Sequence, residues 1–279
     1  MSDSPAIEHR GCRLAYEICG EGPPVLLIQG VGVHGGGWRP QVEALQQSHR
    51  CLSFDNRGMG RSQPLGTRLS VEQMAGDAQA LMDAEGWESA HVIGHSLGGL
   101  IALQLVLSAP ARVRSLSLLC TGACGRELVQ LSWWTFSVGI RTRLGTRRQR
   151  RHAFLEIAMP PSVLAEVDRD SLAESLAPIY GYDLADQPWI AMKQTAATRA
   201  YDATPHLARL GGIPTLVVSA AQDRLAPPRL GRALAAGIEG ARYVEFPDAA
   251  HGLTVQCAEQ VNTLLLVHLM EAEDRRTGS

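Results

Sequence analysis

The sequence predicts an α/β protein in which helices cover both faces of a mostly parallel central sheet. Short runs rich in leucine and β-branched residues alternate along the chain with longer segments of helical periodicity. The run 25–28 is apolar at every position, which is typical of a strand that is covered on both faces. A chain of 279 residues is long enough for one large domain or for a core with an inserted subdomain.

The individual elements are expected in the following places. Strands are expected at 13–18, 25–28, 50–54, 90–93, 113–119, 213–220 and 241–246. Helices are expected at 38–47, 71–85, 97–109, 162–177 and 257–270. In the second of these helices, Met74, Ala78, Leu81 and Met82 fall on one face. Because strands and helices alternate, most of the strands should run parallel.

The segment 124–204 breaks this alternation, because it shows helical patterns and no clear strand. We therefore predict a helical insertion at 124–204 between two parts of one core, 1–123 and 205–279. Its arginine-rich run is either a docking patch for anions or a solvated face that pairs with the acidic stretch after it, and we favour the second interpretation. The run consists of Arg141, Arg143, Arg147, Arg148, Arg150 and Arg151.

Composition excludes several classes of protein. Hydrophobic residues make up 45% and charged residues 19%, which indicates a globular chain, and the net charge of −2 gives no electrostatic case for binding nucleic acid. No pair of cysteines has the spacing of a zinc site, so we expect free, mostly buried thiols and no metal. We see no signal segment and no apolar run of about 18 residues, and so expect a cytoplasmic protein with no membrane partner. The cysteines are Cys12, Cys19, Cys51, Cys120, Cys124 and Cys257.

The most informative stretch runs from Gly94 to Gly98 and reads Gly-His-Ser-Leu-Gly. It joins a predicted strand to a predicted helix, which is the setting of a nucleophile elbow. There the turn strains the serine backbone, and the small residues on either side let neighbouring backbone pass, so that the hydroxyl of Ser96 stands clear of the sheet. The alternative is a structural turn with a capping serine. A functional Ser96 requires a base and an orienting carboxylate elsewhere in the chain.

Two residues that follow predicted strands fit these roles. In parallel sheets, functional groups gather at the carboxyl ends of the strands. Asp223 follows the strand 213–220, in a short loop that ends in two prolines, and His251 follows the strand 241–246. We predict that Ser96 is a nucleophile, that His251 is its base and that Asp223 orients His251.

Other histidines and acids near these positions are weaker candidates. His95 neighbours Ser96, but successive side chains diverge, so we expect it to pack and not to bond Ser96. His34 lies in a glycine-rich loop, where it either contacts substrate or is an incidental loop residue. Asp55 also ends a strand, but Arg57 follows so closely that we expect an ion pair between the two.

A serine nucleophile also needs two preorganised donors for the oxyanion that its attack creates. The backbone N–H of Leu97 is one candidate, because it begins the helix after the elbow. The backbone N–H of Val31 is the other, in the glycine-rich loop after the strand 25–28, where Gly30 frees the preceding turn. We therefore predict an oxyanion hole formed by Leu97 and Val31.

Four motifs together resemble the α/β-hydrolase family, over roughly 12–123 and 205–270. They are Leu-Leu-Ile-Gln-Gly at 26–30, Asp-Asn-Arg-Gly-Met-Gly-Arg-Ser at 55–62, the elbow at 94–98, and the loops that hold Asp223 and His251. The resemblance implies the α/β-hydrolase fold, with 124–204 as a helical cap over the active site. Many relatives have His-Gly where this chain has Gln29 and Gly30, and we include both residues, with His34, among the candidate substrate-binding residues.

Within the family, the nucleophile separates the reaction classes. Dehalogenases and epoxide hydrolases of this fold carry aspartate at the elbow, whereas Ser96 indicates acyl transfer without a cofactor. We therefore expect a hydrolase of small to medium apolar carboxylic esters. The aromatic residues Trp133, Trp134 and Phe136, with Met159 and Met192, either form an apolar substrate pocket or pack the cap onto the core.

Other functions remain open at this point. The first alternative is a lactonase or a carbon–carbon bond hydrolase of ring-cleavage products, since members that resemble this chain use similar triads. The least favoured alternative is a ligand receptor that keeps the fold and the triad without catalysis. The sequence does not indicate an oligomeric state.

Overall fold

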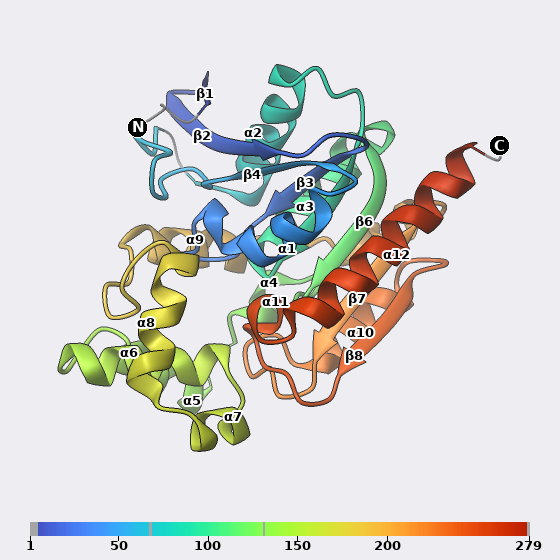
Figure 1. Cartoon of the computed structure of the whole chain (residues 1–279). Helices are drawn as coiled ribbons and strands as arrows, with labels where there is room; N and C mark the ends of the chain where they lie inside the picture. The colour runs from blue at the N-terminus through green and yellow to red at the C-terminus, as the bar shows by residue number, and fades with distance from the viewer. Residues whose placement is uncertain (1–4, 67–68, 131, 278–279) are drawn as a thin grey trace.

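One sheet forms the centre of the protein (Figure 1). The computed structural model describes residues 5–66, 69–130 and 132–277. Within these residues the sheet has eight strands. In spatial order they are β1 (Ala6–His9), β2 (Cys12–Cys19), β4 (Arg50–Phe54), β3 (Pro24–Ile28), β5 (Ala90–His95), β6 (Val113–Leu119), β7 (Thr215–Ala220) and β8 (Arg242–Phe246).

The sheet is mostly parallel, as the sequence predicts. Strands β4, β3, β5, β6, β7 and β8 pair in parallel, whereas β2 pairs antiparallel with both β4 and β1. The short edge strand β1 was not among the expected strands, because four residues are too few for a clear alternating pattern. The carboxyl ends of the parallel strands therefore meet at one edge of the sheet, where the candidate site lies.

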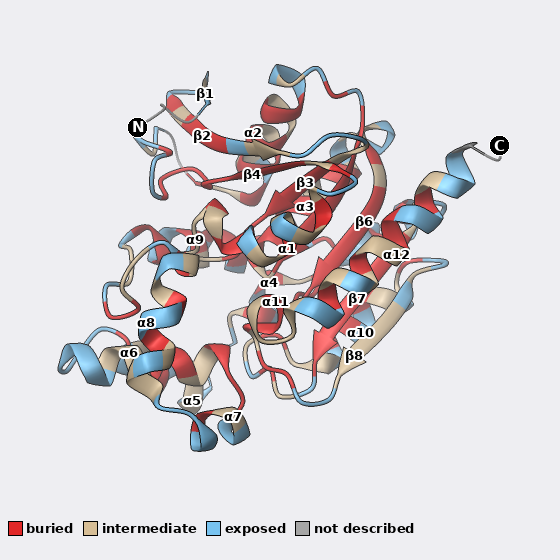
Figure 2. Ribbon diagram, in the orientation of Figure 1, coloured by how far each residue is buried: buried red, intermediate tan, exposed pale blue. Residues whose placement is uncertain are grey.

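Helices cover both faces of the sheet, and alternate residues of each strand point to opposite faces. The central strands between these helices are largely buried (Figure 2). In β3, Leu26 and Ile28 belong to the hydrophobic cluster beneath α2, α3 and α10, while Val25 and Leu27 belong to the cluster beneath α1, α11 and α12. The core is thus two apolar layers separated by the sheet. These helices are α1 (Arg39–Leu45), α2 (Val71–Ala84), α3 (Leu97–Ser108), α10 (Pro228–Ala236), α11 (Leu253–Gln256) and α12 (Ala258–Thr277). Short 3-10 turns lie at Gly35–Trp38, Pro110–Arg112 and Thr204–Leu210.

A group of helices between β6 and β7 projects from one end of the sheet (Figure 1). Part of this group has its own hydrophobic cluster, in which Leu155, Leu164 and Leu176 come from three successive helices. Its last helix instead buries Ile190 and Ala197 in the main core. The boundaries 124 and 204 of the insertion stay a prediction. The helices are α4 (Gly125–Leu128), α5 (Trp133–Arg141), α6 (Arg147–Ala158), α7 (Pro161–Glu166), α8 (Arg169–Tyr180) and α9 (Ile190–Ala200).

The helix expected at 162–177 is two helices, α7 and α8. The break has a local cause, because Asp168 is extended and its carboxylate accepts the N–H of Ser171 at 2.8 Å. An aspartate in this position caps a new helix and competes with continuation of the old one. The helical character of the segment is therefore correct, but its continuity is wrong.

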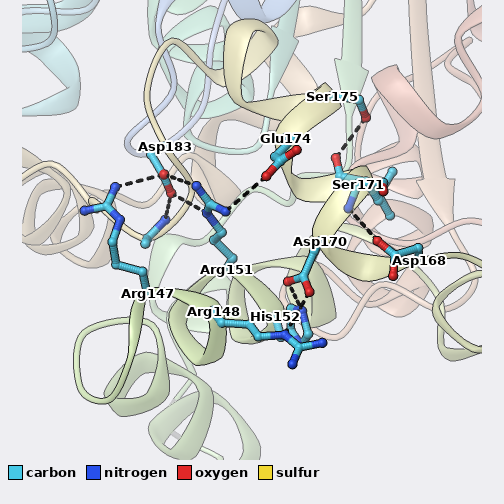
Figure 3. Close-up of polar contacts among 12 residues, drawn as sticks. Arg147, Arg148, Arg151, His152, Asp168, Asp170, Ser171, Glu174, Ser175 and Asp183 are labelled. Atoms are coloured by element: carbon cyan, nitrogen blue, oxygen red, sulfur yellow. Dashed lines mark hydrogen bonds and ion pairs between the residues drawn. The ribbon is translucent and has the colours of Figure 1, made fainter.

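Four arginines of the arginine-rich run, Arg141, Arg147, Arg148 and Arg151, pair with acidic residues that follow them, and three of these pairs are drawn in Figure 3. Arg147 contacts Asp183 at 2.8 Å and Asp186 at 2.7 Å. Arg148 contacts Asp170 at 2.8 Å. Arg141, which Figure 3 does not label, binds Glu156. The interpretation as a solvated, internally paired face is supported, since the acids of the same helical group already take these guanidinium groups.

The expected ion pair between Asp55 and Arg57 is wrong. The guanidinium of Arg57 is fully buried and binds the carboxylate of Asp77, on α2, through two hydrogen bonds of 2.6 and 2.9 Å. Asp55 instead accepts the N–H of Gly35 at 2.8 Å and contacts Arg61. The error arises because Asp77 is close in space but distant in sequence.

Two further expectations concern cysteines and membranes. All six cysteines are free thiols; Cys12, Cys51 and Cys120 are buried, and the other three are half-buried. Among the described helices, none has both the length and the apolar character needed to cross a bilayer.

We predict that replacing Asp77 with alanine lowers the free energy of unfolding by about 3–5 kcal/mol, because Arg57 would remain buried without its partner. Asp83, on the same helix, pairs with Arg112 but is 57% exposed. Its replacement with alanine should cost at most about 1 kcal/mol. Urea unfolding of both variants measures the difference, and equal losses would contradict the assigned importance of the buried pair.

Candidate active site

Ser96 lies between β5 and α3 in a strained backbone conformation. Its φ is 54° and its ψ is −118°, a region that residues with a side chain rarely adopt. A Cβ atom on Gly94 would lie 2.3 Å from the carbonyl oxygen of Gly98, and one on Gly98 would lie 2.0 Å from that of Ile28. The two glycines are therefore required by close backbone packing, as the elbow pattern predicts.

The backbone N–H and carbonyl of Ser96 are both hydrogen-bonded, one to the end of β6 and the other to the segment that follows this strand. The N–H of Ser96 donates to the carbonyl of Leu119 at 2.9 Å, and the hydroxyl of Thr121 donates to the carbonyl of Ser96 at 2.8 Å. These bonds leave the hydroxyl of Ser96 free to interact with other side chains. The residue itself is half-buried.

The structure brings Ser96, His251 and Asp223 together. The Nε2 atom of His251 lies 3.1 Å from the hydroxyl oxygen of Ser96, and its Nδ1 atom lies 2.7 Å from a carboxylate oxygen of Asp223. An aspartate carboxylate can only accept, so Nδ1 carries the proton and Nε2 is the acceptor for the hydroxyl. This is the geometry that a general base for Ser96 needs.

Asp223 is buried and is held as a carboxylate. Its second oxygen accepts the backbone N–H groups of Leu225 and Ala226 at 2.8 and 2.9 Å. Burial acts to raise the pKa of Asp223, but His251 and the two N–H groups outweigh it, and the pKa lies below its ordinary value. The carboxylate is thus fixed in position and charged when it faces the imidazole of His251.

His95 packs beneath the site and is not bonded to Ser96. Its Nε2 atom donates to the carbonyl of His251 at 2.9 Å, and the centres of the two rings are 4.9 Å apart. Burial is the main cause that lowers the pKa of His95, to about 3. The packing role expected for His95 is therefore what the structure shows, with the addition that it supports the backbone of His251.

The predicted oxyanion donors lie around Ser96. Leu97 is the first residue of α3, so its N–H has no acceptor within the helix. Gly30 lies against Ser96, because a Cβ atom on it would be 3.0 Å from the Cβ of Ser96. The next residue, Val31, donates its N–H to no other group in the described part of the chain. Neither N–H group is taken by another acceptor among the described residues, and the oxyanion hole formed by Leu97 and Val31 stays a prediction.

The remaining candidates from the same loop point elsewhere. The side-chain oxygen of Gln29 accepts the N–H of Gly30 at 3.1 Å, which shapes the loop from within. The ring of His34 lies 3.9 Å from Asp55 and contacts the ring of Tyr182 at 6.0 Å between centres. Both residues line the junction between core and insertion, and a direct contact of either with substrate stays a prediction.

The aromatic residues of α5 are in two different environments. Trp133 is 88% exposed and Phe136 is 53% exposed, and their rings contact each other with centres 6.4 Å apart. Trp134 instead packs under the guanidinium of Arg224, 4.2 Å from its ring centre. Trp133 and Phe136 thus do not pack the insertion onto the core, and a role of the three aromatic residues in binding substrate stays a prediction.

Two of the cavities among the described residues bear on the position of the site. One, of about 20 Å³, lies beside His95 and is lined by Gln29, Val33, Gly37, Ile179, Tyr180, Gly252, Thr254 and Val255. The other, of about 460 Å³, contains none of the three site residues and is lined by Leu65, Leu69, Ser70, Glu72, Lys193, Ala196, Ala197, Ala200 and Tyr201. We assign the site by the hydrogen-bond geometry of its side chains and not by the size of the cavity.

Sequence reasoning missed two residues at the end of β6. One is Thr121, which bonds the carbonyl of Ser96. The other is Cys120, whose backbone has a positive φ of 47° and whose buried thiol lies against Asp223. Burial, reinforced by the Asp223 carboxylate, raises the pKa of Cys120 well above its ordinary value, so the thiol is neutral. Their place directly after a parallel strand was the available signal, but only acids and histidines were sought there.

One group of side chains could in principle hold a metal ion. A ligand atom of each of His95, Cys120 and His251 lies within 4.8 Å of the others among the described residues. Both ring nitrogens of His251 already bond Ser96 and Asp223, and Nε2 of His95 bonds a backbone carbonyl. The group is explained by the support of His251, and we assign no metal to it.

Comparison with known proteins decides the family. A model of the alpha/beta hydrolase fold matches residues 23–255. The chain belongs to the α/β-hydrolase fold family. The family expected from the four motifs, and the fold class, are thereby confirmed.

Relatives in this family carry several different names. The chain is 34% identical to the candidate carbamate hydrolase RutD of Azorhizobium caulinodans, over 91% of this chain and 93% of that protein. It is 33% identical to the candidate non-heme bromoperoxidase BpoC of Mycobacterium tuberculosis, over 91% and 96%. The solved enol-lactonase of Burkholderia xenovorans superposes with a TM-score of 0.80 at 28% identity, over 95% and 100%. These comparisons support a hydrolase and leave its substrate open.

The lowered pKa of His95 makes the protein sensitive to acid in a defined range. The folded protein binds a proton at His95 only near pH 3, whereas an unfolded histidine binds one near 6.5. Between these values the unfolded state binds more protons, so stability present above about pH 6.5 is lost as the pH falls. We expect a loss of about 1.4 kcal/mol per pH unit from this residue.

Urea unfolding at about pH 7, 6 and 5 measures this effect. The variant His95→Gln cannot titrate there and should show a flatter dependence on pH, whereas His206→Gln, at an exposed position, should keep the wild-type dependence. Parallel curves for wild type and His95→Gln would show that His95 does not contribute.

Proposed function

We propose that the protein is a serine hydrolase that cleaves carboxylic esters of small to medium apolar substrates through an acyl-enzyme intermediate. The observation that carries this proposal is the continuous hydrogen-bond chain from Ser96 through His251 to Asp223. A serine hydroxyl is a weak nucleophile without such a base. The strained backbone of Ser96 adds support, because strain of this kind is retained where a side chain must be presented for a function.

In the first half of the reaction, the hydroxyl oxygen of Ser96 attacks the ester carbonyl. His251 takes the hydroxyl proton at Nε2, and Asp223 stabilises the imidazolium that forms. When the carbon–oxygen bond to the alcohol breaks, His251 returns this proton to the leaving alcohol. The acyl group then remains on Ser96.

In the second half, a water molecule attacks the acyl carbonyl and gives a proton to His251. The bond to Ser96 breaks, the same proton returns to its hydroxyl and the carboxylic acid leaves. In both halves the carbonyl oxygen becomes an oxyanion, which the N–H groups of Leu97 and Val31 would stabilise. Loss of one such donor typically lowers kcat by about 10²–10³.

The apolar side of the site supports the substrate class. Val33 of the loop after β3, Ile179 and Tyr180 of α8 and Val255 of α11 line the space beside His95. Apolar side chains so close to the residue that supports His251 favour ligands with an apolar acyl or alcohol group.

A second candidate is a lactonase, which the likeness to the solved enol-lactonase favours. A lactone is a cyclic ester, so the same attack, oxyanion and acyl release apply, but the alcohol stays attached to the acyl group. Hydrolysis of a carbon–carbon bond is a further alternative, and a ligand receptor without turnover is the least favoured. Purified protein assayed with p-nitrophenyl butyrate, a γ-lactone and a vinylogous diketone separates these functions.

We predict that wild type hydrolyses p-nitrophenyl butyrate and is labelled by a fluorophosphonate, and that Ser96→Ala abolishes both. Without the hydroxyl there is no nucleophile and no atom for the label. Ser108→Ala, at the far end of α3, where the hydroxyl bonds only backbone carbonyls, should behave as wild type. A wild type that is neither labelled nor active on esters and lactones would refute the proposal.

A further inference from the structure

One residue of the insertion reaches the loop that carries Val31. Gln194 lies on α9 and is fully buried, and its side-chain oxygen accepts the backbone N–H of Gly32 at 2.7 Å. No other residue of the insertion hydrogen-bonds this loop through a side chain in the described part of the chain. Sequence analysis did not single out Gln194, since nothing in the local pattern of α9 distinguishes it from a core residue.

Both ends of the loop are held by hydrogen bonds, from Gly30 to the side chain of Gln29 and from Gly35 to Asp55, but the residues next to Val31 have few restraints of their own. Around Val31 the loop reads Gly30-Val31-Gly32, and Gly32 has a φ of 72°, so backbone rotation on both sides of Val31 meets few steric limits. Its own closing hydrogen bond, from the N–H of Val33 to the carbonyl of Gly30, is long at 3.5 Å. Gln194 therefore supplies a restraint that the glycines do not.

Other residues of the insertion also pack against Gly32. A Cβ atom on Gly32 would lie 3.4 Å from the Cβ of Ala191, 3.6 Å from Pro188 and 3.8 Å from the hydroxyl of Tyr182. The hydroxyl of Thr198 bonds the carbonyl of Gln194 and belongs to the same helix. The side chain of Gln194 thus approaches Gly32 from a packed helix and not from a free loop.

The side-chain amide nitrogen of Gln194, unlike its oxygen, is left without an acceptor among the described residues. The Nε2 atom of Gln194 is buried and has no hydrogen-bond partner among the described residues. A buried donor without a partner costs about 1–3 kcal/mol, so this glutamine is not the choice that stability alone would favour. The cost is understandable if the oxygen of Gln194 serves the neighbouring site.

We propose that Gln194 is a positioning residue for the oxyanion hole. Gln194 accepts the N–H of Gly32 and so fixes the orientation of Val31. The N–H of Val31 then stays directed at the oxygen of the substrate carbonyl group when Ser96 attacks. The inference rests on the proposed function, because it needs an oxyanion at Ser96. The insertion thereby contributes to transition-state stabilisation through Gln194, which acts on the N–H of Val31.

The test replaces Gln194 with methionine, which has a similar volume and no acceptor oxygen. We expect kcat for p-nitrophenyl butyrate to fall about 10–100-fold while KM stays within about threefold, because the oxyanion forms only after binding. The inhibition constant of phenylboronic acid, whose adduct on Ser96 places an oxygen in the oxyanion hole, should rise by a similar factor. A merely structural role would not weaken this inhibitor selectively.

Thr195→Val is the matched control, since Thr195 is on the same helix and its hydroxyl bonds only the carbonyl of Ala191 within it. It should keep the wild-type kcat and inhibition constant. If Gln194→Met keeps both as well, or changes only KM, the inference is wrong. A wild type without hydrolase activity would instead refute the proposed function, so the two failures are distinguishable.

If Gln194→Met does not fold, two further measurements decide. Gln194→Asn keeps the amide but is one methylene shorter, and we expect it to lose kcat as methionine does. In wild type, amide exchange followed by nuclear magnetic resonance should show the N–H of Gly32 protected at least about 100-fold. Exchange of this N–H at the rate of an exposed loop would overturn the inference.

Discussion

The strained turn at Ser96 is the constraint on which the site depends. A positive φ at a residue with a side chain costs of order 1–3 kcal/mol and persists only where the surroundings enforce it. Here β3, β5 and α3 approach so closely that a Cβ atom on Gly98 would lie 2.0 Å from the carbonyl oxygen of Ile28. Burial of β5 and the first turn of α3 in the two apolar layers holds this approach in place. The position of the Ser96 hydroxyl is thus a consequence of core packing.

The sequence sufficed for the fold and for the three residues of the hydrogen-bond chain because these depend on local rules. Glycine spacing indicates the turn at Ser96, and the carboxyl ends of parallel strands meet at one edge, which brings Asp223 and His251 to it. Contacts between segments far apart in sequence could not be predicted in this way. Arg57 binds Asp77 and not Asp55, and Gln194 reaches Gly32, because the tertiary arrangement and not the local pattern selects these partners.

The insertion is stabilised differently from the core. Its helices α6 to α8 bury a small hydrophobic cluster of their own, and around it guanidinium and carboxylate groups pair at the surface (Figure 3). Exposed pairs contribute little each, typically under about 1 kcal/mol, so the arginine-rich run adds charge balance more than stability. The group is tied to the main core by α9, which buries Ile190 and Ala197 there, and by Leu128 of α4.

The core and the insertion support the two halves of the site to different extents. The chain from Ser96 to Asp223 is held by core elements through Leu119, Thr121 and the backbone after Asp223. The insertion adds one contact, because the carbonyl of Ala158 on α6 accepts the N–H of Gly252 beside His251 at 2.8 Å. The loop with Val31 is bounded on its outer side by the insertion, through Gln194 and Ala191. Changes near Gln194 and Ala191 would therefore alter the loop with Val31 first, whereas changes near Ala158 would reach the backbone beside His251. Such a division is consistent with relatives of the same fold that are named for different reactions, from carbamate hydrolysis to enol-lactone hydrolysis.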